Sequence, residues 1–127
     1  MTSQSQGLHV FLDYTGAYFD DHLDAEWMLS VMRKAVSAST AREVHAHVAA
    51  FDGTVSPPGF AAVVLIDESH ITAHSYADRG LLAVDCFTCG STDPNLVADH
   101  LHQALIAVFP DVVLERRDQV KRFLHGG

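Results

Sequence analysis

Basic residues are scarce in this chain of 127 residues. Lys and Arg together number 8 against 16 Asp and Glu, which gives a formal net charge of -8 at pH 7 with neutral histidines. Proteins that bind nucleic acid or an anionic membrane surface need clustered Lys and Arg. The sequence therefore argues against both of these partners and favours a small molecule that is cationic or zwitterionic.

Long apolar runs are also absent. No stretch approaches the roughly 20 residues that cross a membrane, and residues 1–7 lack the basic and apolar regions of a secretory signal. A hydrophobic content of 48% with 19% charged residues is typical of a folded globular domain rather than a disordered chain. We therefore expect a single domain over residues 1–127, located in the cytoplasm.

Cysteine is limited to Cys86 and Cys89, in the spacing C-x-x-C. A redox role requires such a pair at a strand-to-helix turn, and a zinc role requires two further ligands nearby. Neither context is evident, and alternation along a strand would send the two side chains to opposite faces. A dithiol or metal role is therefore disfavoured, and Cys86 is interpreted as a small buried apolar residue.

Histidine, by contrast, is abundant, with nine residues. His45 and His47 are separated by two positions and so point to the same face of a strand. Such a pair can bind a metal, but nothing in the spacing of the other histidines selects a third and fourth ligand. We expect solvated or structurally bonded histidines and no metal site.

The hydrophobic pattern predicts two helices among several strands. Apolar residues recur at three- and four-residue intervals over residues 18–37, with acidic residues early and basic residues late, which is typical of an amphipathic helix. Its Trp27 is interpreted as core packing. Asp93-Pro94 is a strong start for a second helix, which Pro110 ends. Strands are expected at residues 8–14, 43–51, 60–66, 71–76 and 81–88, with an edge strand at 111–117 before a polar tail.

This order, β-α-β-β-β-β-α-β with mostly hairpin-linked strands, predicts an α+β two-layer sandwich: a mainly antiparallel sheet with two helices on one face. Residues 60–66 are continuously apolar, as expected of a strand buried on both faces. A second copy of the chain could cover the face that the helices leave free. We therefore expect sheet-on-sheet pairing into a four-layer α/β/β/α homodimer.

Residues 65–90 concentrate reactive side chains in apolar surroundings. Polar groups inside apolar strands are costly unless they have partners or a task. The stretch contains Glu68, Ser69, two histidines and both thiols. Simple pleating would put Ser69 and His74 on opposite faces, so a joint role for these two residues requires a bend or break after Glu68.

Three motifs in this stretch share the spacing of one known family. They are Glu68-Ser69-His70, then His74 five residues after the serine, then Thr88-Cys89-Gly90 with the cysteine twenty residues after it. This arrangement resembles the bacterial S-adenosylmethionine decarboxylase proenzymes. The resemblance continues more weakly through Gly7-Leu8-His9 and both predicted helices, so it covers most of the chain.

The resemblance implies a self-cleaving, pyruvoyl-dependent decarboxylase. Cleavage between Glu68 and Ser69 would give a β chain of residues 1–68 and an α chain of residues 69–127, and Ser69 would become the pyruvoyl cofactor. That ketone forms a Schiff base with a substrate amine and accepts the electrons left when CO2 departs. His74 would be the base of the processing reaction, and Cys89 would protonate the substrate carbanion.

Two positions depart from the family pattern. The family usually has a serine that assists processing where this chain has Ala61, and Thr72 or Ser75 could supply a donor instead. The family also usually shows a Trp-Pro-Glu segment that helps to hold the adenosyl group, where this chain has Tyr76 and Asp78. Both residues keep the chemical type, since a phenol ring can pack on adenine and an aspartate can accept a hydrogen bond from ribose.

The substrate implied first is S-adenosylmethionine, whose decarboxylation supplies the aminopropyl donor for spermidine and other polyamines. Some relatives of the family decarboxylate ornithine or arginine instead, and their cationic side chains would pair with carboxylates such as Asp13 or Asp78. A third possibility, suggested by Ala61, is an unprocessed homologue that keeps the fold without the cofactor.

Overall fold

The computed structural model describes residues 7–89 and 92–123 of the chain. In chain order the elements are β1 (Gly7–Thr15), α1 (Ala25–Ser37), β2 (Glu43–Phe51), β3 (Gly59–Ile66), β4 (Ser69–Tyr76), the 3-10 turn η1 (Ala77–Arg79), β5 (Leu81–Cys89), α2 (Pro94–Val108) and β6 (Val113–Arg122). The predicted order of strands and helices and the α+β class are confirmed.

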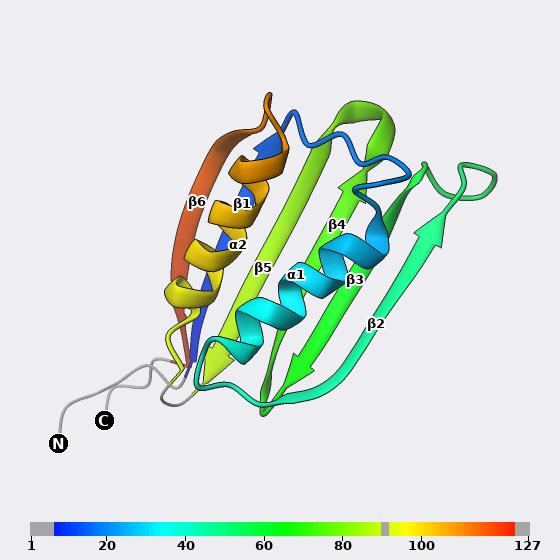
Figure 1. Ribbon diagram of the computed structural model, residues 1–127. Helices are drawn as coiled ribbons and strands as arrows, with labels where there is room; N and C mark the ends of the chain where they lie inside the picture. The colour runs from blue at the N-terminus through cyan, green and yellow to red at the C-terminus, as the bar shows by residue number, and fades with distance from the viewer. Residues whose placement is uncertain (1–6, 90–91, 124–127) are drawn as a thin grey trace, which may run out of the picture.

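The six strands form one sheet in the order β2-β3-β4-β5-β1-β6, and every neighbouring pair is antiparallel. Both helices lie on the same face of this sheet (Figure 1). No described helix or strand of the chain covers the opposite face, which we name the open face. Leu65 of β3 is 41% exposed there, so a single chain buries only one face of this apolar strand.

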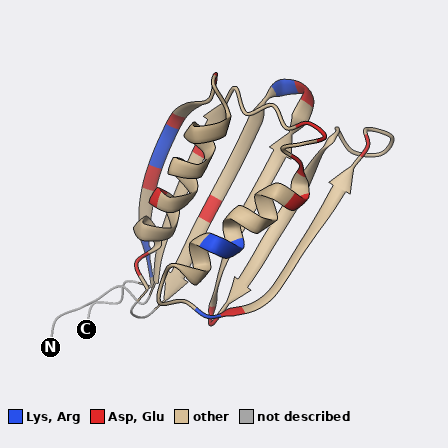
Figure 2. Ribbon diagram, in the orientation of Figure 1, with Lys and Arg blue, Asp and Glu red and all other residues tan. Residues whose placement is uncertain are grey.

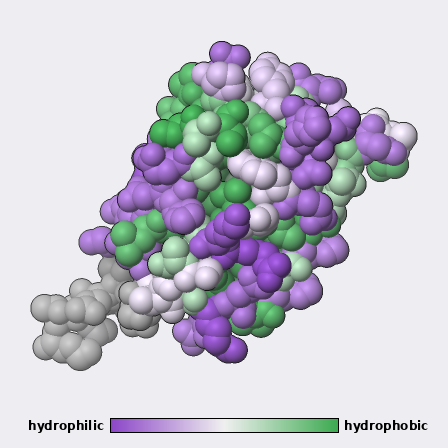
Figure 3. Space-filling model, in the orientation of Figure 1, coloured by the Kyte–Doolittle hydropathy of each residue, from purple (hydrophilic) through white to green (hydrophobic). Residues whose placement is uncertain are grey.

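The core lies between the sheet and the two helices. Alternate residues of β3, β4 and β5 are buried toward the helices, and Met32 of α1 and Leu101 of α2 are fully buried against them. Burial of a side chain of this size contributes about 1.5–3 kcal/mol. Hydrophilic residues spread over the outer side of the helical layer, with hydrophobic groups between them (Figure 3).

Helix α1 is shorter than predicted at its N-terminus. It begins at Ala25 because the Asp24 carboxylate accepts a hydrogen bond from the backbone N–H of Trp27 at 2.9 Å and caps the helix. Upstream, the Asp20 carboxylate accepts bonds from two successive backbone amides, a local alternative to helix. Trp27 packs against Phe19 and Phe109, which confirms its predicted role in the core. Among the described residues, no helix has the length and apolar content needed to cross a membrane.

Strand β6 is the predicted edge strand, but it continues to Arg122, so the prediction that the strand ends at residue 117 was wrong. Its backbone pairs with β1 along the whole of that strand, and this ladder requires no apolar side chains because β6 is an edge strand. Charges of both signs alternate along it (Figure 2). Helix α2 begins and ends close to the predicted positions, with Asp93 as its N-cap and Phe109 as its C-cap.

Candidate active site

The turn between β3 and β4 has an unusual backbone conformation. Ile66 pairs with Ser69, so only Asp67 and Glu68 connect the two strands. Glu68 has a φ of 62°, a left-handed conformation that costs a residue with a side chain about 1–2 kcal/mol. Two-residue hairpins that need a positive φ normally use Gly or Asn there. The strained residue is the one expected to precede the cleaved bond.

Ser69 begins β4 directly after this turn. Its side chain faces the helices and is only 9% exposed, and its Oγ accepts a hydrogen bond from the backbone N–H of Cys89 at 2.9 Å. A cavity of about 230 Å³ opens beside it, lined by Thr40, Ala41, Arg42, Ile66, Asp67, Glu68, Ser69, Thr88, Cys89 and Thr92. The structure thus places Glu68, Ser69 and Cys89 around one small cavity at the end of the sheet.

The two cysteines differ in environment. Cys86 faces the helices and is fully buried, and burial together with the charge of Asp85 raises the pKa of its thiol to about 12. Cys89 lies on the opposite face and is only half-buried, and both thiols are free. The predicted orientation on opposite faces is confirmed, and Cys89 is the more accessible thiol.

The side chains of His74 and Ser69 lie apart from each other within one chain. The register of β4 with β3 runs without a shift from Ser69 to Tyr76, so the expected bend after Glu68 does not bring these two side chains together. His74 is exposed on the open face, whereas Ser69 faces the helices. Five residues of strand also separate their Cα atoms by about 17 Å. The cross-strand partner of His74 is Ala61, which carries no hydroxyl.

The expected substrate-binding residues gather near His74, at the end of β4 remote from Ser69. Tyr76 is 43% exposed on the open face, and Asp78 follows in η1. Asp13 of β1 is exposed and lies in the same row across the sheet as His74, with Ala83 of β5 between them. We name the two groups of residues by position, the Ser69 end and the Tyr76 end of β4.

The two candidate donors near Ala61 are placed differently. Thr72 lies on the open face, two residues from His74, and its hydroxyl is 3.4 Å from a carboxylate oxygen of Asp85. Ser75 is buried toward the helices, and its Oγ has no hydrogen-bond partner among the described residues. Of these two residues, only Thr72 therefore lies on the same face of the sheet as His74.

A pair that the sequence reasoning did not identify occupies the centre of the open face. His9 Nε2 and the Asp85 carboxylate are 3.0 Å apart. The neighbouring His70 packs on Phe87, and burial, together with the proximity of His9, lowers its pKa. His9 belongs to the Gly7-Leu8-His9 motif, but its partner Asp85 lies 76 residues away, which no local spacing could reveal.

A pair of histidines lies at the edge of the sheet. The rings of His45 and His47 stack with centroids 6.4 Å apart on the exposed edge strand β2. Within residues 7–89 and 92–123, no group of three or more His, Cys, Asp or Glu side chains is arranged to hold a metal ion.

The fold and this site together define a class of protein: an α+β sandwich with a strained two-residue turn directly before a buried serine. The family model described as S-adenosylmethionine decarboxylase matches residues 8–116. The chain belongs to the S-adenosylmethionine decarboxylase family.

Named relatives agree with this assignment. The S-adenosylmethionine decarboxylase proenzyme of Brevibacillus brevis is 39% identical over 100 residues, covering 78% of this chain and 72% of that protein. The proenzyme of Bacillus velezensis is 36% identical over 106 residues, covering 82% and 79%. A crystal structure of the adenosylmethionine decarboxylase from Aquifex aeolicus superposes with a TM-score of 0.74 at 24% identity, covering 97% of this chain and 95% of that one, and shows the same fold.

Proposed function

We propose that this protein cleaves itself between Glu68 and Ser69 and then decarboxylates S-adenosylmethionine with a pyruvoyl group derived from Ser69. The observation that carries the proposal is the strained Glu68 placed directly before a buried serine, beside a cavity that Cys89 also lines. S-adenosylmethionine is proposed as the substrate because the relatives are named S-adenosylmethionine decarboxylase proenzymes. The two free thiols are consistent with a reducing compartment, the cytoplasm.

The first step of processing needs only atoms that the turn already holds. Ser69 Oγ forms a bond to the carbonyl carbon of Glu68, the peptide C–N bond breaks, and the hydroxyl proton passes to the nitrogen, leaving an ester. A base then removes the proton from Ser69 Cα, the Cβ–Oγ bond breaks, and Glu68 leaves with a carboxylate. Water hydrolyses the remaining enamine and releases ammonia. Relief of the left-handed Glu68 conformation favours the first step.

The residues around Ser69 fit a pyruvoyl group. The cavity leaves room beside Ser69, and the backbone N–H of Cys89 donates to Ser69 Oγ, the oxygen that leaves with Glu68 when the pyruvoyl group forms. A pyruvoyl group there supplies an electron sink for decarboxylation. Cys89, half-buried and on the rim of the same cavity, is the thiol placed to deliver a proton to substrate carbon. Cys86 faces the helices, is fully buried and is not one of the residues that line the cavity.

The remaining functional residues must come from a second copy of the chain. His74, Tyr76, Asp78 and Asp13 all belong to the Tyr76 end, too far along the strand to act on Ser69 of their own chain. If two open faces stack with their β4 strands antiparallel, the Tyr76 end of each copy lies over the Ser69 end of the other. Such a pairing also covers Leu65 and the rest of the open face, and it corresponds to the four-layer dimer expected above.

Charge supports a cationic substrate. The chain has a net charge of -8, and the exposed carboxylates Asp13 and Asp78 lie at the Tyr76 end. S-adenosylmethionine carries a sulfonium and an ammonium group, which these carboxylates would attract. Tyr76 provides a half-exposed ring for the adenine or the sulfonium.

Intact-mass measurement of the purified chain tests the proposal. We expect two fragments, residues 1–68 and residues 69–127, the second without a free N-terminal amine, and a single intact chain for Ser69→Ala. CO2 release should then be faster from S-adenosylmethionine than from ornithine or arginine. An intact wild-type chain with an unmodified Ser69 after prolonged incubation would instead support a non-catalytic homologue, for which the Ala61 neighbour of His74 is the structural reason.

A further inference from the structure

The Asp67–Glu68 turn needs something that holds it in its strained shape. A two-residue connection with a left-handed glutamate can relax by changing the orientation of either peptide group, and with it the position of the Glu68 carbonyl relative to Ser69 Oγ. Attack by the hydroxyl requires that carbonyl in a fixed position. The residue that fixes the turn is therefore a part of the processing machinery.

Arg42 forms hydrogen bonds with Asp67 through both its backbone and its side chain. Its carbonyl oxygen accepts a hydrogen bond from the backbone N–H of Asp67 at 3.2 Å. Its guanidinium donates to both carboxylate oxygens of Asp67, from Nε at 2.9 Å and from Nη2 at 2.7 Å. A bidentate pair of this kind fixes orientation as well as distance. One residue of the segment before β2 thus restrains the residue that precedes Glu68.

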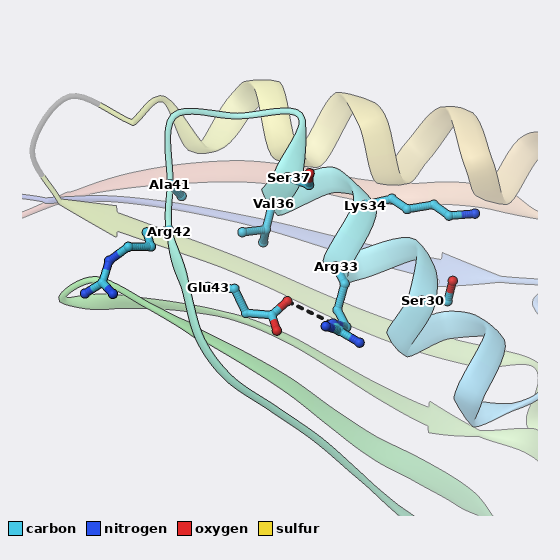
Figure 4. Close-up of a pocket in the computed structure, with 8 residues that line it drawn as sticks. All are labelled: Ser30, Arg33, Lys34, Val36, Ser37, Ala41, Arg42 and Glu43. Atoms are coloured by element: carbon cyan, nitrogen blue, oxygen red, sulfur yellow. Dashed lines mark hydrogen bonds and ion pairs between the residues drawn. The ribbon is translucent and has the colours of Figure 1, made fainter.

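A second arginine of the same groove provides the comparison. Arg33 and Arg42 both line the groove between α1 and β2 (Figure 4). Arg33 points to Glu43, with Nε 2.9 Å from its carboxylate, whereas Arg42 points away from Glu43 toward the hairpin that joins β3 and β4. The two side chains are 56% and 75% exposed. Only Arg42 contacts the turn and lines the cavity of Ser69.

We propose that Arg42 is a positioning residue for self-cleavage, which holds Asp67 and so keeps the Glu68 carbonyl in place for attack by Ser69 Oγ. The inference rests on the proposed function. Because both side chains of the Arg42–Asp67 pair are largely exposed, the pair adds little to global stability. Its effect falls on the conformation of the turn. The hydrogen bond from Arg42 also lowers the pKa of Asp67, so the pair stays charged at neutral pH.

The step that Arg42 assists is the formation of the ester. The bond from Ser69 Oγ to the Glu68 carbonyl carbon forms while the C–N bond breaks, and no further reactant is needed. Hydroxylamine cleaves such an ester and leaves a hydroxamate on Glu68 and a free amine on Ser69, products that mass spectrometry separates from those of self-cleavage. It therefore reports ester formation independently of elimination and of decarboxylase activity.

The experiment compares freshly purified, full-length wild type, Arg42→Gln, Arg42→Lys and the control Arg33→Gln, with and without hydroxylamine. Arg42→Gln should slow both self-cleavage and hydroxylamine cleavage about fivefold, a factor that corresponds to the loss of one exposed ion pair. The cleavage rates of Arg42→Lys should lie between those of wild type and Arg42→Gln, because an ammonium cannot make the bidentate contact. Arg33→Gln should cleave like wild type. The double variant Arg42→Asp/Asp67→Arg exchanges the two charges. It should recover part of the cleavage rate that either single substitution loses.

The outcomes separate the two proposals. If wild type, Arg33→Gln and Arg42→Gln all cleave at the same rate, the positioning role is wrong and the proposed function stands. The role is also wrong if Arg42→Gln slows self-cleavage but not hydroxylamine cleavage, since Arg42 would then act after the ester forms. A thermal unfolding midpoint lowered in Arg42→Gln but not in Arg33→Gln would identify a merely structural pair. If no variant and no wild type cleaves at Ser69, both proposals fall.

Discussion

The two ends of β4 differ in what they offer. The Ser69 end has a strained turn, a buried hydroxyl held by a backbone amide, and a half-buried thiol. The Tyr76 end has an exposed imidazole, an exposed ring and carboxylates. One end contains the groups that would react, and the other contains the groups that would act on them or bind a ligand. Under the proposed function, each chain would carry two half-sites, which become a whole site only between copies.

The strongest test of this comparison is a mixture of two variants. His74→Ala should cleave at least about 100-fold more slowly than wild type, the usual contribution of a general base, and Ser69→Ala should not cleave at all. When the two chains are co-expressed, the His74→Ala chain should be cleaved by the partner's imidazole while the Ser69→Ala chain stays intact. Co-expression with the double variant is the control. A His74→Ala chain that cleaves equally slowly in both mixtures would show that the base acts within its own chain.

A second test sharpens the contrast between the two thiols of the Ser69 end. Cys89→Ala should lower turnover about 100-fold while leaving substrate binding in place, because the proton donor for the substrate carbanion is lost. Cys86→Ala should change turnover less than about twofold, since it only removes a small group from the core. Equal losses for the two substitutions, measured as CO2 release per cleaved chain, would point to a dithiol or metal site.

A third test addresses the Tyr76 end. Asp78→Asn should raise the Michaelis constant for S-adenosylmethionine about tenfold and change turnover far less, because a contact remote from the reacting carbon contributes mainly to binding. Steady-state CO2 release checks this, with the neighbouring Arg79→Gln in the same turn as control. If ornithine or arginine is used at least as readily as S-adenosylmethionine, Asp78 is instead the partner of a substrate cation.

The smallest expected effect concerns pH and His70, near the Ser69 end. Burial lowers the pKa of His70 in the folded chain, so the folded state binds fewer protons than the unfolded state. The resulting stability is present above the unfolded pKa of about 6.5 and is lost as pH falls toward the folded value. When the pH is lowered from 8 to 5.5, the midpoint temperature of thermal unfolding should therefore fall less for His70→Gln than for wild type. His100→Gln, at an exposed position of α2, should behave like wild type.

Local patterns predicted the features that depend on local physics. The hydrophobic pattern located β2 without error at either end, and strand geometry alone put Cys86 and Cys89 on opposite faces. Asp93-Pro94 predicted the start of α2 because capping and a fixed φ act within one turn. The periodic pattern over residues 18–37 misplaced the start of α1, because Asp20 and Asp24 bind backbone amides themselves.

The parts of the site that escaped prediction depend on residues distant in sequence. The Arg42–Asp67 pair joins positions 25 residues apart, and the His9–Asp85 pair joins positions 76 apart. The left-handed Glu68 follows from the register of two strands, which forces the connection into two residues. The separation of Ser69 from His74 was suggested by pleating, but the regular run of β4 that makes it real is a property of the whole sheet.

The turn at Asp67 and Glu68 has an electrostatic consequence. Ordinary hydrolysis of a peptide bond creates a carboxylate and an ammonium together, so the local charge barely changes. Cleavage that releases the nitrogen of Ser69 as ammonia would create the carboxylate alone, on a residue that already carries one and beside Asp67. Processing would make the cavity mouth one unit more negative, with Arg42 the cation held beside it. The maturation of the chain would thus increase its attraction for a positively charged substrate at the place where that substrate reacts.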